Sequence, residues 1–201
     1  MTYRMRSQSL DLRDALAICV GLGIAFQIGH FAEHTIQFAV WVAGTYHWIV
    51  TTFCGRDVPY MSPLAMVLVN KLGALMFPAA DRARQLMLGM EFLHLFGNFL
   101  FLSTIAGVFY FMPSKWARYG FYIEGGHLCE HLALCLTAFW LGKPIGVSTL
   151  FGQSVYWLGH EGAVGYRVAW HFAMNLVPMP LVMVGMMKHT CSPPLAAAAA
   201  E

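Results

Sequence analysis

The chain alternates long apolar stretches with short polar breaks. Five stretches come near or exceed the roughly 20 residues that a helix needs to cross a bilayer: residues 15–44, 60–80, 85–112, 116–141 and 164–187. Polar turns at 79–82 and 113–115 separate three of them, and Ser114 is placed to cap the helix that follows it. The pattern predicts an all-α integral membrane protein, a bundle of about five transmembrane helices.

The remaining segments set the expected organisation. We expect a cytoplasmic N-terminal segment over 1–14, a single transmembrane helical domain over 15–190, and a disordered tail or cloning remnant over 191–201. Residues 145–160 could add a sixth short or re-entrant element. The distribution of Lys and Arg over this five-helix topology favours a cytoplasmic N-terminus and an external C-terminus.

Composition supports the membrane class. Hydrophobic residues make up 58% of the chain and charged residues 11%, and the mean hydropathy is +0.58. A soluble domain carries about 25% charged residues, so a soluble globular domain and a disordered chain are excluded. The net charge of +2 comes from scattered residues, which argues against a nucleic-acid partner. We expect the lipid bilayer, in particular the bacterial cytoplasmic membrane, as the surroundings.

Ionisable residues inside a bilayer are costly, so each one is a candidate functional residue. Here they recur at spacings of three, four or seven, which places each set on one face of its helix. The candidate metal ligands are His30, Glu33, His34, Glu91, His94, Glu124, His127, Glu130, His131 and His171.

Two short patterns occur twice among these residues. The string H-x-x-E-H begins at His30 and again at His127, and histidines at i and i+4 can reach one metal ion. The string E-x-x-H begins at Glu91 and Glu124, the spacing that paired helices supply in carboxylate-bridged dinuclear bundles. The repetition indicates a metal site, and it is also consistent with an old duplication.

A hairpin turning at Pro113 would bring His94 and His131 to the same depth. His127 lies one turn from His131, so we expect these three histidines to converge on one ion. By the same reasoning Glu91 and Glu124 would be carboxylate ligands or bridges.

We expect Glu130 and Glu33 to hold neighbouring metal ligands in place without binding the ion directly. Counted from Arg13 and Arg84, His30 lies roughly 10 Å deeper than His94. Two separate sites or a wide dinuclear one are therefore both open.

Mixed His and Glu ligands without paired Cys suit iron, zinc, manganese or copper(II), and we expect iron before copper or zinc. The number of ligands indicates two ions. The predicted function is a redox or oxygen-dependent reaction on an apolar substrate, performed by a membrane-bound metal-dependent oxidoreductase whose catalytic residues are not assigned. By residue type, these helices resemble the histidine boxes of integral-membrane di-iron hydroxylases and desaturases, although spacing and order differ.

Other functions fit some of the same residues. Intramembrane Glu and His could line a proton or metal-ion pathway, with Lys71 and Arg167 balancing charge. Histidines on facing helices could hold haem b in a cytochrome subunit. The H-x-x-E-H string also matches the inverted zincin pattern, which makes a membrane zinc protease a further alternative. An electron-transfer partner, membership of a larger membrane complex, and a homo-oligomer are all left open.

Overall fold

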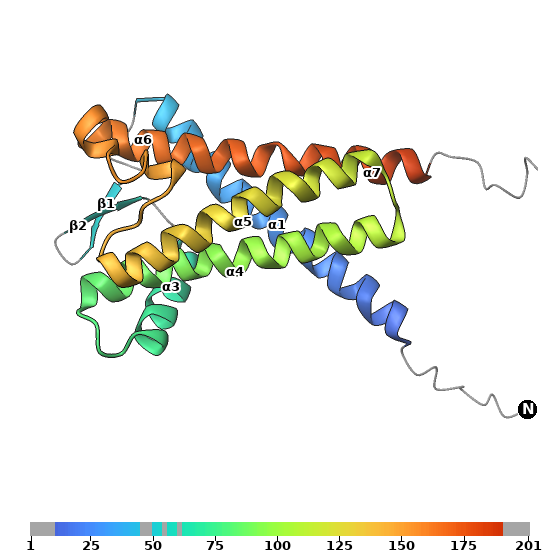
Figure 1. Ribbon diagram of the computed structural model, residues 1–201, viewed down its shortest axis with the longest axis horizontal. Coiled ribbons are helices and arrows are strands. Elements are labelled where there is room, and N and C mark those ends of the chain that lie inside the picture. Colours follow the sequence, from blue (N-terminus) through green and yellow to red (C-terminus); the bar gives the residue numbers. More distant parts are fainter. Residues whose placement is uncertain (1–10, 45–49, 54–55, 60–61, 191–201) are drawn as a thin grey trace, which may run out of the picture.

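The computed structural model describes residues 11–44, 50–53, 56–59 and 62–190, and it shows an elongated, predominantly helical protein (Figure 1). The helices are α1 (Leu12–Val42), α3 (Pro63–Met76), α4 (Arg82–Phe111), α5 (Lys115–Leu141), α6 (Ser154–Leu176) and α7 (Pro178–Thr190), with a short 3₁₀ helix η1 (Val147–Thr149). A small antiparallel hairpin, β1 (Val50–Phe53) with β2 (Arg56–Pro59), follows α1.

Side chains fix the starts of four helices. Asp11, Ser62, Asp81 and Ser114 each accept a hydrogen bond from the backbone N–H three residues on, at the starts of α1, α3, α4 and α5. Gly142 ends α5 in the left-handed conformation, at φ 71°. These local signals place the helix ends within a few residues of the sequence expectation.

Among the described residues, three helical stretches are long and apolar enough to cross a membrane: α1, α4 and the α6–α7 stretch Ser154–Lys188. Helix α5, at 27 residues, has the length but carries more charged side chains. Helix α3 has only 14 residues, roughly 21 Å, and is too short to span. The prediction of a spanning helix over 60–80 is therefore wrong, and five spans are not confirmed.

Residues 145–160, considered as a sixth element, form η1 and the start of α6. Helix α6 thus begins ten residues before the predicted helix, with a non-helical Gly159 at φ 72° inside it.

The short α3 changes how the chain is threaded. In Figure 1 the start of α1, the α4–α5 turn and the end of α7 all lie at the same end of the molecule. Two contacts agree: the Arg13 guanidinium lies over the Phe111 ring, and the Lys188 ammonium over the Trp116 ring. Both described ends of the chain are therefore on one side, which corrects the expectation that they lie on opposite sides.

The larger buried apolar cluster lies towards this end of the bundle, and a smaller one joins α3 to the start of α4. Val20, Phe101, Ile105, Val108 and Val182 form one buried cluster from α1, α4 and α7. By contrast, the middle of the bundle is filled by polar side chains, because most of the fully buried large side chains there are His, Glu, Gln or Asn. The fold thus separates a packed apolar end from a polar centre.

Helices α3 and α4 pack with their backbones in close contact. A Cβ on Gly89 would lie 2.3 Å from the Val69 carbonyl oxygen, and one on Gly73 would lie 2.1 Å from that of Gln85. Glycine at both positions is what allows this approach. The short α3 is thereby held against the part of α4 that carries Glu91 and His94.

Candidate metal centre

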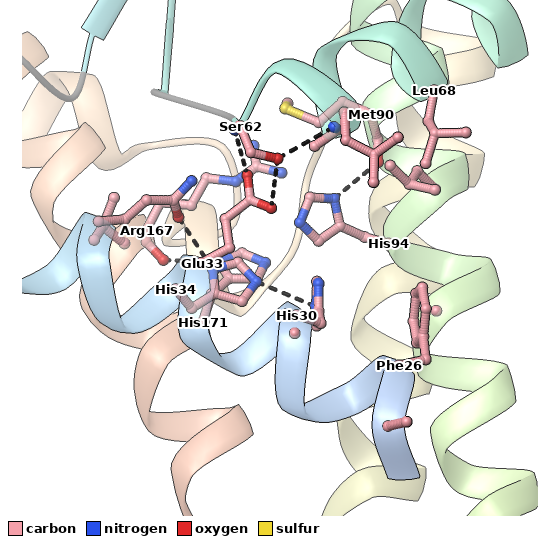
Figure 2. A pocket seen from close by; sticks show the side chains of 18 residues that line it. Phe26, His30, Glu33, His34, Ser62, Leu68, Met90, His94, Arg167 and His171 are labelled. Carbon is pink, nitrogen blue, oxygen red and sulfur yellow. Dashed lines mark hydrogen bonds between the residues drawn. The ribbon is translucent and has the colours of Figure 1, made fainter. Parts of the chain in front are cut away.

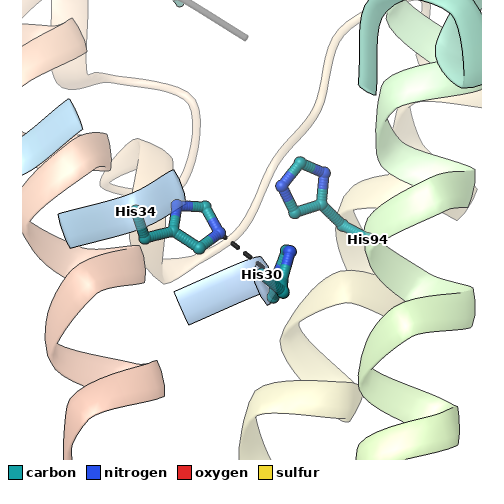
Figure 3. A group of neighbouring side chains, drawn as sticks. All are labelled: His30, His34 and His94. Atoms are coloured by element: carbon teal, nitrogen blue, oxygen red, sulfur yellow. Dashed lines mark hydrogen bonds between the residues drawn. The ribbon is translucent and has the colours of Figure 1, made fainter. Parts of the chain in front are cut away.

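Six histidines meet in the centre of the bundle and form two groups of three. The first group is His30 and His34 of α1 with His94 of α4 (Figure 3). The second is His127 and His131 of α5 with His171 of α6. Within each group one ring nitrogen from each residue lies within 4.8 Å of the others. We refer to them as the N-terminal trio and the C-terminal trio.

The paired histidines have the spacing of two ligands on one ion. His30 Nε2 lies 3.2 Å from His34 Nε2, and His127 Nε2 lies 3.2 Å from His131 Nε2. Two nitrogens bound tetrahedrally at about 2.0–2.1 Å from one ion are roughly 3.3 Å apart. The i, i+4 pairs of both H-x-x-E-H strings therefore already have the geometry of a coordination edge.

Hydrogen bonds at the other ring nitrogen orient three of the rings. His94 Nδ1 lies 2.8 Å from the Met90 carbonyl oxygen, and His171 Nδ1 lies 2.7 Å from that of Arg167. A carbonyl oxygen only accepts, so Nδ1 carries the proton and Nε2 of the neutral ring keeps its lone pair. His34 Nδ1 is similarly placed 3.1 Å from Gln37 Oε1. This is the support that metal-binding histidines ordinarily receive.

The two trios touch each other. The ring centroids of His94 and His131 are 5.3 Å apart and nearly parallel, and those of His34 and His171 are 5.7 Å apart, also stacked. Each contact joins a residue of one trio to a residue of the other. In the repeated sequence His34 corresponds to His131 and His94 to His171, so the two contacts are equivalent. The site is thus a single six-histidine cluster with approximate two-fold symmetry.

The prediction that His94, His127 and His131 converge on one ion differs from this grouping. His94 stacks on His131, but its ligand nitrogen lies with those of His30 and His34, and His171 completes the other trio. The depth difference expected for the first helix is also wrong. Helix α1 runs opposite to α4, and His30 lies 42 − 30 = 12 residues from the end of α1 while His94 lies 94 − 82 = 12 from the start of α4.

The carboxylates lie around the trios and not within them. Glu130 accepts hydrogen bonds from the backbone N–H groups of Val147 and Ser148, at 2.9 and 2.8 Å. Glu33 accepts from the Ser62 backbone N–H at 2.9 Å. The Glu of each H-x-x-E-H string therefore anchors a later segment of its own half.

The two E-x-x-H glutamates have different surroundings. Glu91 is fully buried and pairs through Oε1 with Arg167 of α6, whereas Lys71, the other residue expected to balance charge, is exposed. Glu124 is fully buried, its Oε2 lies 3.5 Å from His127 Nδ1, and neither of its oxygens has a hydrogen bond within the described part of the chain. Neither belongs to a trio, so the structure does not place them as bridging ligands.

A second repeat accompanies H-x-x-E-H. His94 and His171 are each followed four residues later by an asparagine, and the amide of each asparagine, Asn98 or Asn175, donates 2.8 Å to its histidine's carbonyl oxygen. This H-x-x-x-N string completes a duplicated unit. Both copies are present in the sequence, but the string was not among the predicted repeats. Gln27 precedes His30 as Glu124 precedes His127, and it donates to Asn175 Oδ1 at 2.7 Å.

Fold and site together define a helical protein with membrane-length apolar helices and a buried six-histidine cluster. Residues 1–191 match the model of DUF6008, a family of unknown function, and the chain belongs to this family. No curated protein and no solved structure matches the chain.

Proposed function

We propose that the protein holds two metal ions inside a membrane-embedded helix bundle and uses them in a redox or oxygen-dependent reaction on an apolar molecule. The observation that carries this proposal is the pair of tri-histidine groups, one from each half of the chain. Imidazole is a ligand for iron, copper, zinc and nickel, and iron and copper carry out one-electron and dioxygen chemistry.

The donor set bears on the choice of metal. Glu33 and Glu130 bind backbone groups, Glu91 pairs with Arg167, and Glu124 lies beside His127 Nδ1 outside both trios. Each ion would therefore be held by three neutral imidazoles. A ligand set made only of nitrogen atoms suits copper as well as iron. We therefore propose copper alongside the iron that the sequence predicts. Three protein ligands also leave a fourth position open on each ion, the arrangement found in reactive sites.

Packing alone is a weaker explanation for six histidines. Helices in membranes pack closely through small residues, and one polar side chain usually suffices for an interhelical hydrogen bond. Here six imidazoles converge, and three of them have Nδ1 hydrogen-bonded to an oxygen. Haem fits less well, because its two axial imidazoles lie on opposite faces of the macrocycle, whereas the facing rings here stack 5.3 and 5.7 Å apart.

We also propose the orientation. The end that carries Arg13, Lys115, Arg118 and Lys188 would lie in the bacterial cytoplasm, and Arg4 and Arg6 precede α1 in the sequence and add to the basic residues before it. The opposite end carries Arg56, Arg82, Arg84 and Lys143. The larger basic count at the first end supports this placement.

The test is elemental analysis of the protein purified in mild detergent, combined with its optical spectrum. We expect two equivalents of copper or iron per chain and no Soret band. A Soret band would show that the protein binds haem, and the proposal of two separate ions would then be abandoned. Absence of metal, after the apoprotein has been offered iron, copper and zinc, would refute the proposal and favour a Glu and His proton pathway.

A further inference from the structure

The two trios differ in their access to the outside of the bundle. In the C-terminal trio His127 and His131 are fully buried and His171 is 4% exposed. In the N-terminal trio His30 and His94 are only partly buried. All three of its histidines line a cavity of about 380 Å³, whereas His171 is the one histidine of the C-terminal trio among the lining residues (Figure 2).

The cavity has an apolar lining apart from the histidines and a few polar groups. It lies among α1, α3, α4 and α6, and its volume is within the range of small-molecule sites. Leu64 and Leu68 of α3 and Phe26 of α1 line it and are 70%, 39% and 39% exposed. These three residues place its mouth between α1 and α3, on the side of the bundle that faces lipid in a membrane.

Polar groups at the cavity are already engaged. Glu33 is bound to Ser62, and Arg167 is paired with Glu91. Among the residues the structure describes there, the lining therefore offers no unpaired cation for an anionic ligand, and the Glu33 oxygens are turned to Ser62. An apolar molecule entering sideways from the bilayer is the occupant that this lining would favour.

Resting on the proposed function, we infer that the two ions have different tasks. The ion held by His30, His34 and His94 keeps an open coordination position towards the cavity and is the one that an apolar molecule from the lipid reaches. The ion held by His127, His131 and His171 is more enclosed, because only His171 of its three ligands borders the cavity, and it does not bind that molecule. Both ions would have three protein ligands, so the difference between them is access: only the N-terminal trio has all its ligands at the cavity.

The duplication supplies a matched pair of positions for the test. Gly29 directly precedes His30 and lines the cavity, and Gly126 directly precedes His127 and does not. A Cβ on either glycine would meet no atom within 4 Å, so a side chain can begin at both positions without a clash. Gly29→Leu fills part of the cavity, whereas Gly126→Leu adds the same atoms outside it.

The experiment loads the detergent-solubilised protein with cobalt(II) and titrates it with 4-phenylimidazole, an apolar metal ligand. We expect two cobalt ions per chain, of which one changes its optical spectrum on binding. Gly29→Leu should weaken that binding roughly tenfold or more, because the filled cavity would be overpacked. Gly126→Leu should bind as the wild type does, and both variants should keep two ions.

The outcomes separate this inference from the proposed function. If the wild type takes up no cobalt, copper or iron, the proposed function fails before any probe is added, and the inference fails with it. If two ions bind but both or neither respond to 4-phenylimidazole, only the inference is overturned. It is also overturned if Gly29→Leu and Gly126→Leu affect the binding equally.

Discussion

Replacing Glu130 by Gln should destabilise the protein without removing metal. The buried carboxylate accepts two backbone N–H groups, from Val147 at 2.9 Å and Ser148 at 2.8 Å. A hydrogen bond to a charged group contributes about 1.5–3 kcal/mol. Gln keeps one oxygen as an acceptor but turns an NH₂ group towards the second N–H, so one bond is lost and the other is weakened. We expect a loss of about 2–4 kcal/mol in the free energy of unfolding.

The matched variant is Glu33→Gln. Glu33 accepts from the Ser62 backbone N–H at 2.9 Å and lies 3.4 Å from the Ser62 hydroxyl. A hydroxyl can also accept, so the new amide could donate to it while its oxygen keeps the backbone bond. The expected cost is therefore only about 1 kcal/mol.

Both values can be measured by reversible unfolding in mixed micelles with increasing dodecyl sulfate, alongside the metal content of the folded protein. The reasoning would be refuted if Glu130→Gln lost metal while keeping its stability, because Glu130 would then act on the ions and not on the backbone near η1. Equal losses of stability in the two variants would refute the distinction between their partners.

Two further predictions concern packing. Glu91→Gln should lower the free energy of unfolding by about 3–5 kcal/mol, because it leaves the Arg167 cation inside the bundle without its partner. In the same unfolding assay, replacing both residues by Leu should cost less than replacing either one alone by Leu. Gly89→Ala should lower the free energy of unfolding by about 1–3 kcal/mol, because its Cβ would meet the backbone of α3. The control Gly21→Ala should be neutral or stabilising, since a Cβ there meets nothing within 4 Å. Equal effects of the two alanines would argue against the close α3–α4 packing.

Sequence periodicity was enough to predict the long helices, because apolar runs and capping residues are local signals. Asp81 and Ser114 each precede a helix that begins one residue later. The length of α3 was not predictable in the same way. Residues 60–80 are mostly apolar, and the helix is ended at Met76 by Phe77 in a non-helical conformation and by the proline that follows.

The site residues were recognisable as a set, but their grouping was not. Assigning His30 to a depth required knowing which end of α1 lies beside Arg82, and that depends on whether α3 crosses the bundle. Arg167 was noted as a charge, but its pairing with Glu91, 76 residues away, arises from the packing of α6 against the rest of the bundle. Contacts of this kind are set by tertiary structure and leave no spacing in the sequence.

The H-x-x-x-N repeat is a different case. His94 with Asn98 and His171 with Asn175 repeat one spacing, and in each half an H-x-x-E-H string precedes it. Taken together, the two strings predict two three-histidine units of the same design. The structure adds that the units face each other and that one of them is more enclosed.

The most direct test of the two-site account is the metal content of five proteins: wild type, His34→Ala, His131→Ala, the double variant and a control. Each single change removes one ligand from one trio, and His160→Ala, an exposed histidine outside both trios, serves as the control. We expect two ions per chain in the wild type and the control, one in each single variant and none in the double variant. Two ions retained in either single variant, or none in the wild type, would contradict the account.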